Sequence, residues 1–384
     1  MPVSAIDKAR RFGMLVAIAI FASCGGRIAP QEESPATPVA EVSAGGGHVC
    51  ALLRNGELRC WGQNDVGQLG NGLTDELCTR EPRSPSCSLR PTSVVGIPDA
   101  VKVCAGGWHS CALRANADVM CWGRNDWGQL GDGTAVNRAV PVRVVGLPAN
   151  VVEVACGLGV GTCARTIDGD VWCWGESMLE PREGNLPKGH PVAQQVAAIR
   201  HATQIAIGWD RACAVIDDGS VQCWGNSRHG CEHERPLTPV PTAIPDVRDA
   251  TAISSSADVI LRADGSLLTG FAGCPTPGVI GTVRDAVQVS GDEVSLCYRD
   301  RRGVGHCIDS GGNSPAILGD GTRHRDLDRV STLPFAPLAQ VAVGLWVACA
   351  IDVRGELRCW GNNYSGAVGD GTTTDRDVPT LVRL

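Results

Sequence analysis

Short runs of alternating apolar and polar residues recur along most of the chain. The runs VKVCAGG (101–107) and VVEVACG (151–157) are of this kind, and each leads through a second apolar run and a turn to Cys-Trp-Gly. Alternation with a period of two, bounded by Gly, Asn, Asp and Pro, is typical of half-buried β-strands. The pattern therefore predicts an all-β fold built from short strands.

This strand pattern occurs seven times. Six copies carry two cysteines ten residues apart, and the remaining copy, VILRADGSLLTG (259–270), has Val259 and Thr269 in their place. We expect one domain, residues 41–384, folded as a seven-bladed β-propeller whose Ala/Gly-rich strands are innermost. The chain would start with an inner strand and end with an outer one, which favours packing of blade one against blade seven over a shared blade, although how the ring closes stays open in the sequence. The six pairs are Cys50 and Cys60, Cys111 and Cys121, Cys163 and Cys173, Cys213 and Cys223, Cys297 and Cys307, and Cys349 and Cys359.

The turn between the two cysteines predicts a disulfide in each pair. Gly56 lies six residues after Cys50, and a three-residue loop with this glycine in the left-handed conformation would pair Leu53 with Glu57. Cys50 would then lie opposite Cys60, at a separation that a disulfide can span. The second copy has Ala117 in place of the glycine, so a variant turn is expected there.

Six further cysteines allow three more bonds. Cys78 and Cys87 share an insertion, Cys104 and Cys156 occupy equivalent inner strands, and Cys231 and Cys274 follow the third strands of neighbouring repeats. Their connectivity stays open in the sequence. The alternative is zinc, but a spacing of ten residues across a hairpin does not match a zinc knuckle. The cluster around His229, Cys231 and His233 lacks an obvious fourth ligand, so we expect no metal and no cofactor.

The N-terminus indicates export. Basic residues precede the apolar run FGMLVAIAIFA (12–22), which is too short for an ordinary transmembrane helix and is typical of a secretory signal. The sequence FASC that ends it resembles the lipobox of bacterial lipoproteins, with Phe21 where leucine is usual. The resemblance implies a signal peptide at 1–23, a lipid anchor on Cys24 and a Pro-rich tether at 24–40. The alternative is a plain signal peptide that removes Cys24.

The same resemblance implies that the protein belongs to a bacterial cell envelope. Gly25 after the acylated cysteine resembles lipoproteins sent to the outer membrane, where one exists, and the protein would face the periplasm or the exterior. The formal net charge of -7 argues against nucleic acid as a partner.

With GGWHSCALR, CWGRNDWGQLGDGT and VPVRVVGLP in view, the chain resembles the regulator of chromosome condensation repeat family, whose members are seven-bladed propellers. The resemblance is strongest in copies one, two and seven. Members include a chromatin-bound nucleotide exchange factor, a plant ultraviolet sensor and secreted bacterial inhibitors of β-lactamase. Because function resides in the loops of such scaffolds, the resemblance implies the fold and assigns no activity.

Two loop corners of each repeat should lie on one face, where they would form a candidate binding surface for an unidentified protein. Aromatic and arginine side chains dominate interface energetics, whereas corner tryptophans can instead pack between blades. No nucleophile–base motif is present, so an enzyme is not expected; an envelope enzyme that binds or cleaves glycans and a passive surface or adhesive protein are the alternatives. The candidate residues are Trp108, His109, Trp127, Trp209, Arg211, Trp346 and Tyr364, with His48, Asn64, Asn125 and Asn363 nearby.

Overall fold

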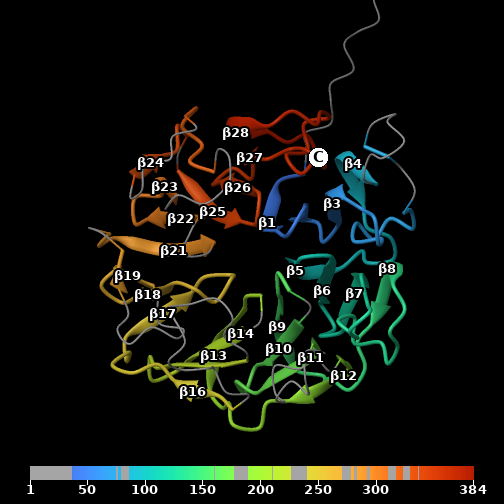
Figure 1. The fold of residues 1–384 in the computed structure, drawn as a ribbon, viewed down its shortest axis with the longest axis vertical. Coiled ribbons are helices and arrows are strands. Elements are labelled where there is room, and N and C mark those ends of the chain that lie inside the picture. The colour runs from blue at the N-terminus through green and yellow to red at the C-terminus, as the bar shows by residue number, and fades with distance from the viewer. Residues whose placement is uncertain are drawn as a thin grey trace, which may run out of the picture. The chain divides into compact units, whose positions relative to one another are not determined.

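Each repeat folds into one four-stranded antiparallel sheet, and seven such sheets are arranged around a central channel (Figure 1). The computed structural model describes residues 37–74, 77–78, 86–159, 161–176, 189–209, 211–225, 240–269, 278–280, 283–291, 295–309, 317–322, 329–335 and 337–384. In every sheet the strands pair in chain order, so each blade is one contiguous segment. The seven-bladed β-propeller expected from the sequence is thereby confirmed.

Each blade has four strand positions, numbered here from the channel outward, and strands at the same position in different blades are equivalent. The innermost are β1 (Val39–Ala44), β5 (Ala100–Ala105), β9 (Val151–Cys156), β13 (Ala202–Ile207), β17 (Ala250–Ile253), β21 (Ala286–Gly291) and β25 (Leu338–Val343). The second are β2 (His48–Leu53), β6 (His109–Arg114), β10 (Gly161–Thr166), β14 (Arg211–Ile216), β18 (Ile260–Arg262), β22 (Ser295–Asp300) and β26 (Val347–Asp352). The third are β3 (Leu58–Gln63), β7 (Val119–Gly123), β11 (Val171–Glu176), β15 (Val221–Gly225), β19 (Leu267–Thr269), β23 (Gly305–Asp309) and β27 (Leu357–Gly361). The outermost are β4 (Cys87–Ser93), β8 (Arg138–Arg143), β12 (Gly189–Gln195), β16 (Thr242–Ala243), β20 (Gly278–Val279), β24 (Arg329–Thr332) and β28 (Arg376–Leu381).

The hairpin between the second and third strands has the expected register. In blade one Gly56 has φ +88°, its amide donates to Leu53 O at 2.9 Å, and Leu53 N donates to Glu57 O at 2.9 Å. The expectation of a variant turn in blade two is wrong: Ala117 has φ +67° and its amide donates to Arg114 O at 3.0 Å. Ala117 thus keeps the same turn in a conformation that is strained for a residue with a Cβ.

This register places the two cysteines of a hairpin directly opposite each other. All six hairpin pairs form disulfides, with Cα–Cα distances of 4.0–4.1 Å. A Cys78–Cys87 bond closes the insertion of blade one, and a Cys104–Cys156 bond joins the inner strands of blades two and three. Cys24, the Cys231–Cys274 pair and the cluster at His229 and His233 lie outside the described residues.

Neighbouring blades are joined by indole hydrogen bonds from the tryptophans of four of the five Cys-Trp-Gly segments, the exception being Trp224. Trp122 is fully buried and donates its indole N–H to Gln68 O of blade one at 2.8 Å. The equivalent bonds run from Trp61 Nε1 to Ala367 O, from Trp174 Nε1 to Gln129 O and from Trp360 Nε1 to Ile317 O. Such a tryptophan contributes a large buried apolar surface and satisfies a backbone acceptor in the preceding blade.

A second set of interblade bonds surrounds the channel. Gln204 donates its amide to Ile253 O at 3.0 Å and accepts from Ile253 N at 2.9 Å, so that it substitutes for a backbone peptide of the neighbouring strand. Gln288 bonds Val341 in the same way, at 2.8 and 3.0 Å. The equivalent residue of blade five is Ala252, whose methyl group is too short to reach blade six.

The ring closes by contact between blade one and blade seven, as the strand order in the sequence indicated. Blade one is built entirely from β1–β4 and blade seven entirely from β25–β28, so no blade is shared between the two ends of the repeat region. Leu345 N donates to Gly45 O at 3.1 Å and Ser365 Oγ donates to Gly47 O at 3.0 Å across this seam. Residues 37–384 form one compact unit.

Candidate binding face

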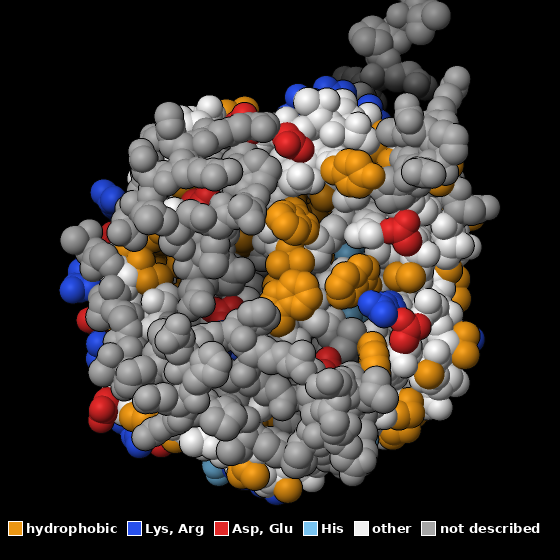
Figure 2. All heavy atoms as spheres, in the orientation of Figure 1, with side chains coloured by type: hydrophobic (Ala, Val, Ile, Leu, Met, Phe, Trp, Pro, Cys, Tyr) orange, Lys and Arg blue, Asp and Glu red, His pale blue; other side chains and the backbone are white. Residues whose placement is uncertain are grey.

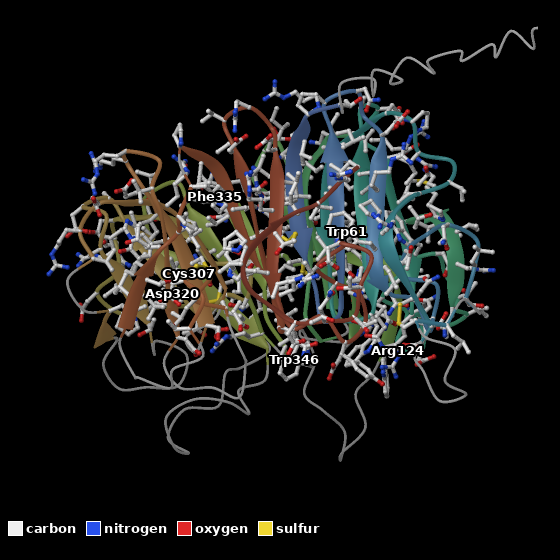
Figure 3. All side chains as sticks on the ribbon, turned by 90° about the horizontal axis from the view of Figure 1, so that it is seen from above. Trp61, Arg124, Cys307, Asp320, Phe335 and Trp346 are labelled. Carbon is white, nitrogen blue, oxygen red and sulfur yellow. A yellow bond between two sulfur atoms is a disulfide. The ribbon has the colours of Figure 1, made fainter. Side chains whose placement is uncertain are left out.

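The connections from first to second strand and from third to fourth strand lie on one face, which we call the corner face. Trp346 belongs to the first kind of connection and Arg124 to the second, and both lie at the same edge of the ring in Figure 3. The Gly56-type hairpins lie at the opposite edge, beside the start of the next blade, where Ala100 N donates to Gly56 O at 3.1 Å. Figure 2 views the corner face and shows hydrophobic side chains gathered beside its centre.

Trp108, Trp209 and Arg124 form a cluster on this face, which we call the corner cluster. The Trp108 and Trp209 rings meet edge to face, with centroids 6.4 Å apart, although they belong to blades two and four. The Arg124 guanidinium lies 5.3 Å from the Trp108 ring centroid, within the range of a cation–π contact. Trp209 is 42% exposed. The cluster therefore presents aromatic surface and a cation together.

Trp346 and Tyr364 form a second exposed aromatic group, at the seam of blades seven and one. They are 42% and 63% exposed and line a pocket of about 300 Å³ with Gly46, Gly47, Gln63, Asn362 and Ser365. We call this the seam pocket.

The expectation from the sequence that His109 and His48 belong to the binding face is wrong. Both side chains are fully buried; His48 Nε2 bonds Ser110 Oγ at 2.7 Å and His109 Nε2 bonds Thr162 Oγ1 at 2.9 Å. Burial lowers the pKa of His48 to about 3 and that of His109 to about 4, so both are neutral at physiological pH. They hold neighbouring blades together and cannot reach a partner.

The three corner asparagines are also buried and organise the loops from within. Asn125 Oδ1 accepts from Leu130 N at 3.0 Å, while its Nδ2 donates to Val136 O at 3.1 Å. Asn64 and Asn363 make equivalent bonds, with Leu69 N and Leu73 O and with Val368 N and Thr374 O. Their role is to fix the loop conformation.

Two further candidates are less available than expected. Arg211 is 11% exposed and forms an ion pair with Asp258, which is equally buried, so its charge is already neutralised within the fold. Trp127 is half-buried; a Cβ added at Gly189 would lie 2.5 Å from its carbonyl oxygen, which shows how closely blade three approaches this corner.

The central channel is a polar site that the sequence pattern did not indicate. It has a volume of about 290 Å³ and is lined by Glu41, Glu153 and the glutamines Gln204, Gln288 and Gln340. Burial raises the pKa of Glu41 and of Glu153, and the nearby cations Lys102 and Arg165 partly offset this. Lys102 Nζ lies 3.5 Å from Glu41 Oε2, and Arg165 Nε donates to Glu153 Oε2 at 2.6 Å. The charges are thus paired.

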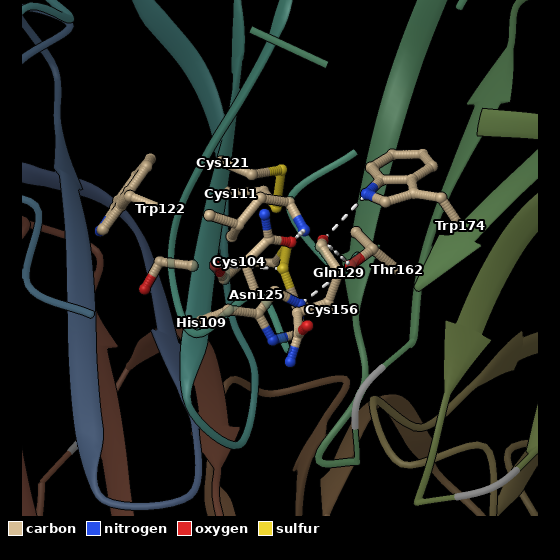
Figure 4. The surroundings of a disulfide bond; sticks show 12 residues. Cys104, His109, Cys111, Cys121, Trp122, Asn125, Gln129, Cys156, Thr162 and Trp174 are labelled. Carbon is tan, nitrogen blue, oxygen red and sulfur yellow. Dashed lines mark hydrogen bonds between the residues drawn. A yellow bond between two sulfur atoms is a disulfide. The ribbon is translucent and has the colours of Figure 1, made fainter. Parts of the chain in front are cut away.

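One cysteine cluster has ligand-like spacing. The sulfur atoms of Cys104, Cys111 and Cys156 lie within 4.8 Å of one another. Figure 4 shows the reason: the Cys104–Cys156 bond lies beside the Cys111–Cys121 bond. Because all four sulfur atoms are in disulfides, this cluster offers no thiolate to a metal.

These features define a disulfide-stapled, seven-bladed propeller scaffold with an aromatic corner face. Models of the regulator of chromosome condensation (RCC1) repeat match residues 39–68, 100–129, 202–231 and 338–367, and also 55–113 and 117–163. The chain carries RCC1 repeats and belongs to that repeat family. Within the described ranges, no helix has the length and apolar character needed to cross a bilayer.

Two characterised proteins are similar to this chain in sequence. The chain is 25% identical over 367 residues to the ultraviolet-B receptor UVR8 of Arabidopsis thaliana, an alignment of 93% of this chain and 72% of the receptor. It is 32% identical over 200 residues to the human E3 ubiquitin-protein ligase HERC2, which covers 49% of this chain and 4% of the ligase. The chain thus spans a small fraction of that relative.

Two solved structures show the same fold. Yeast RCC1 (Prp20), solved bound to Kap60, superposes with a TM-score of 0.54 at 17% identity, covering 90% of this chain and 75% of that one. Human WBSCR16 superposes with a TM-score of 0.50 at 18% identity, covering 90% and 82%.

Proposed function

We propose that this RCC1-type propeller is an exported, lipid-anchored scaffold that binds another protein through its corner face. The observation that carries the proposal is the corner cluster, in which Trp108 and Trp209 meet 6.4 Å apart beside Arg124. Tryptophan and arginine are the residue types that most often dominate binding energy at protein interfaces. Disulfides join the strands that follow Trp108 and Trp209 to their neighbours, at Cys111–Cys121 and Cys213–Cys223, and a preorganised surface lowers the entropy cost of association.

Arg124 is available to a partner although it already has an ion pair. Its Nε donates to Asp126 Oδ2 at 2.6 Å, while the two side chains are 31% and 49% exposed. An exposed ion pair of this kind contributes little to stability, about 0–1 kcal/mol. Its more important effect is to hold the guanidinium over the Trp108 ring.

A non-catalytic role is part of the proposal. Among the described residues, His48 and His109 beside this face have side chains suited to general base chemistry, but both are fully buried and their lowered pKa values make them weak bases. The structure of yeast RCC1 (Prp20) was solved with a protein, Kap60, bound to it, so the fold is compatible with protein recognition.

The binding proposal is tested by affinity capture from envelope extracts with the full chain as bait. We expect a partner that the wild type retains and that a Trp108→Ala/Trp209→Ala variant loses. Val378→Ala is the matched control, because Val378 is an exposed apolar residue, 49% accessible, on the outer strand β28. Equal capture by all three proteins would contradict the proposal and favour a passive surface role.

The anchor is tested separately. Expression of the full chain with a radiolabelled fatty acid should label the wild type and leave Cys24→Ser unlabelled, and only the labelled protein should fractionate with membranes. Cleavage at another position, with release of the mature protein, would instead indicate a plain signal peptide.

A further inference from the structure

The seam pocket is built from three connections and one strand end of two blades. Gly46 and Gly47 come from the β1–β2 connection, Gln63 ends β3, and Trp346 lies in the β25–β26 connection. Asn362, Tyr364 and Ser365 follow β27. The Ser365–Gly47 hydrogen bond fixes the two blades against each other at this point. The pocket is therefore held by the ring closure itself.

Gly47 is the residue that keeps this pocket open. It directly precedes the buried His48, just as Trp108 directly precedes the buried His109 in blade two. A Cβ at position 47 would lie 2.5 Å from Gln63 Oε1, with Gln63 Cβ the next atom at 3.4 Å. A larger side chain here would therefore displace the end of the flexible Gln63 side chain and project toward the pocket.

The pocket has aromatic walls and unused amide groups. Gln63 donates through Nε2 to Asp65, and Asn362 accepts through Oδ1 from Tyr364 N. These bonds orient both amides and use one polar atom of each. Among the described residues nothing bonds Gln63 Oε1 or Asn362 Nδ2, which leaves one acceptor and one donor for a ligand.

The lining selects against charged and against wholly apolar ligands. None of its seven residues is charged, so an ion would lose hydration without gaining a counter-charge. A purely apolar ligand would leave the oriented amides unsatisfied, which costs binding energy. A pyranose ring has C–H faces that pack on aromatic rings and hydroxyl groups that both donate and accept. We propose that the seam pocket binds one neutral pyranose unit of a glycan.

This site is separate from the corner cluster and does not depend on the protein-binding proposal. Its test is calorimetric titration of the full chain with three neutral probes, cellotriose, maltotriose and chitotriose. We expect at least one to bind with a Kd of about 1 mM or tighter, which corresponds to about 4 kcal/mol. Trp346→Ala and Tyr364→Ala should each weaken that binding about tenfold or more.

Gly47→Trp gives the sharpest variant, because it converts the corner of blade one to the Gly-Gly-Trp-His sequence that folds in blade two. It should abolish saccharide binding and leave the unfolding midpoint near that of the wild type, whereas Val378→Ala, on the exposed outer strand β28, should bind normally. The proposal is overturned if no probe binds at about 20 mM, well above the expected Kd. It is also overturned if Gly47→Trp binds as the wild type does, or if this variant loses only a captured protein partner.

Discussion

Gln340 of blade seven and Val42 of blade one exchange two hydrogen bonds across the ring closure. Gln340 Nε2 donates to Val42 O at 3.0 Å, and Val42 N donates to Gln340 Oε1 at 2.9 Å. Gln204 and Gln288 make the same pair of bonds to the next blade, so one side-chain type closes three of the seven seams in the same way.

Blade five lacks this connection, and restoring it should stabilise the ring. In Ala252→Gln the new amide can reach Val289 N and O, as Gln204 reaches Ile253, and the channel has room for it. We expect a gain of about 1 kcal/mol in the free energy of unfolding, measured by urea denaturation. Gln340→Ala should lose about 1–3 kcal/mol, while Gln194→Ala, on the exposed part of β12, should change little. No gain in the free energy of unfolding of Ala252→Gln would mean that the contact between blades five and six does not limit the stability of the ring.

Ala117 should be replaceable by glycine with a gain in stability. Its φ of +67° costs about 1–2 kcal/mol for a residue with a Cβ, and glycine would remove this strain. Because glycine also has more conformational freedom in the unfolded chain, part of this gain in stability is lost. We expect Ala117→Gly to raise the free energy of unfolding by about 0.5–1 kcal/mol. The converse change, Gly56→Ala, should destabilise, because its Cβ would also lie 3.0 Å from Pro98 O. Loss of stability in Ala117→Gly would show that the strain is absent.

Blade five should accept a seventh hairpin disulfide. Ile260 lies opposite Leu268, so Val259 is opposite Thr269 in the same register as the native cysteine pairs. Val259→Cys/Thr269→Cys should oxidise, and closing this short loop is worth about 2–3 kcal/mol, less about 1 kcal/mol for lost packing at Val259. Mass spectrometry after alkylation would detect the bond, and thermal unfolding its effect. A variant that keeps two free thiols would show that the register of this blade differs.

Acidification should destabilise the fold through the buried histidines. Their folded pKa values, about 3 for His48 and about 4 for His109, lie below the usual value near 6.5. The unfolded chain therefore binds more protons, and stability is lost as the pH falls below about 6.5, by about 1.4 kcal/mol per pH unit for each histidine. Glu41 and Glu153, with raised pKa values, act in the opposite direction at pH values above their usual pKa of 4.5.

A His48→Gln/His109→Gln variant separates the two effects, because both carboxylates remain. Chemical denaturation at pH 7, 6 and 5 should show a smaller loss of stability for the variant than for the wild type. Parallel pH profiles would mean that folding does not lower the pKa values of the two histidines.

The hairpins could be predicted in detail because one local rule determines them. A glycine in the left-handed conformation sets the loop length, and the loop length sets which cysteines lie opposite each other. The rule failed only at the hairpin of blade two, where Ala117 replaces the glycine. There the hydrogen bonds of the turn outweigh the strain at Ala117, so the turn does not change.

The binding face was predicted less well because the position of a residue in a repeat does not show whether its side chain is buried or exposed. Trp108 and His109 are adjacent in sequence, yet alternation on the strand turns His109 inward and leaves Trp108 half-buried at the surface. The seam pocket could not be predicted either. It depends on Gly47 and Tyr364, more than 300 residues apart, meeting only when the ring closes.

The contiguous blades also bear on how such a gene can change. Since every sheet is encoded by one uninterrupted stretch, deletion or duplication of a whole repeat would remove or add a complete sheet without leaving a half-formed one. A ring that is closed by a blade shared between both ends does not have this freedom, because its first and last strands must find each other. In the present architecture the gene can vary repeat by repeat, and the main constraint on blade number is whether the new circle can close.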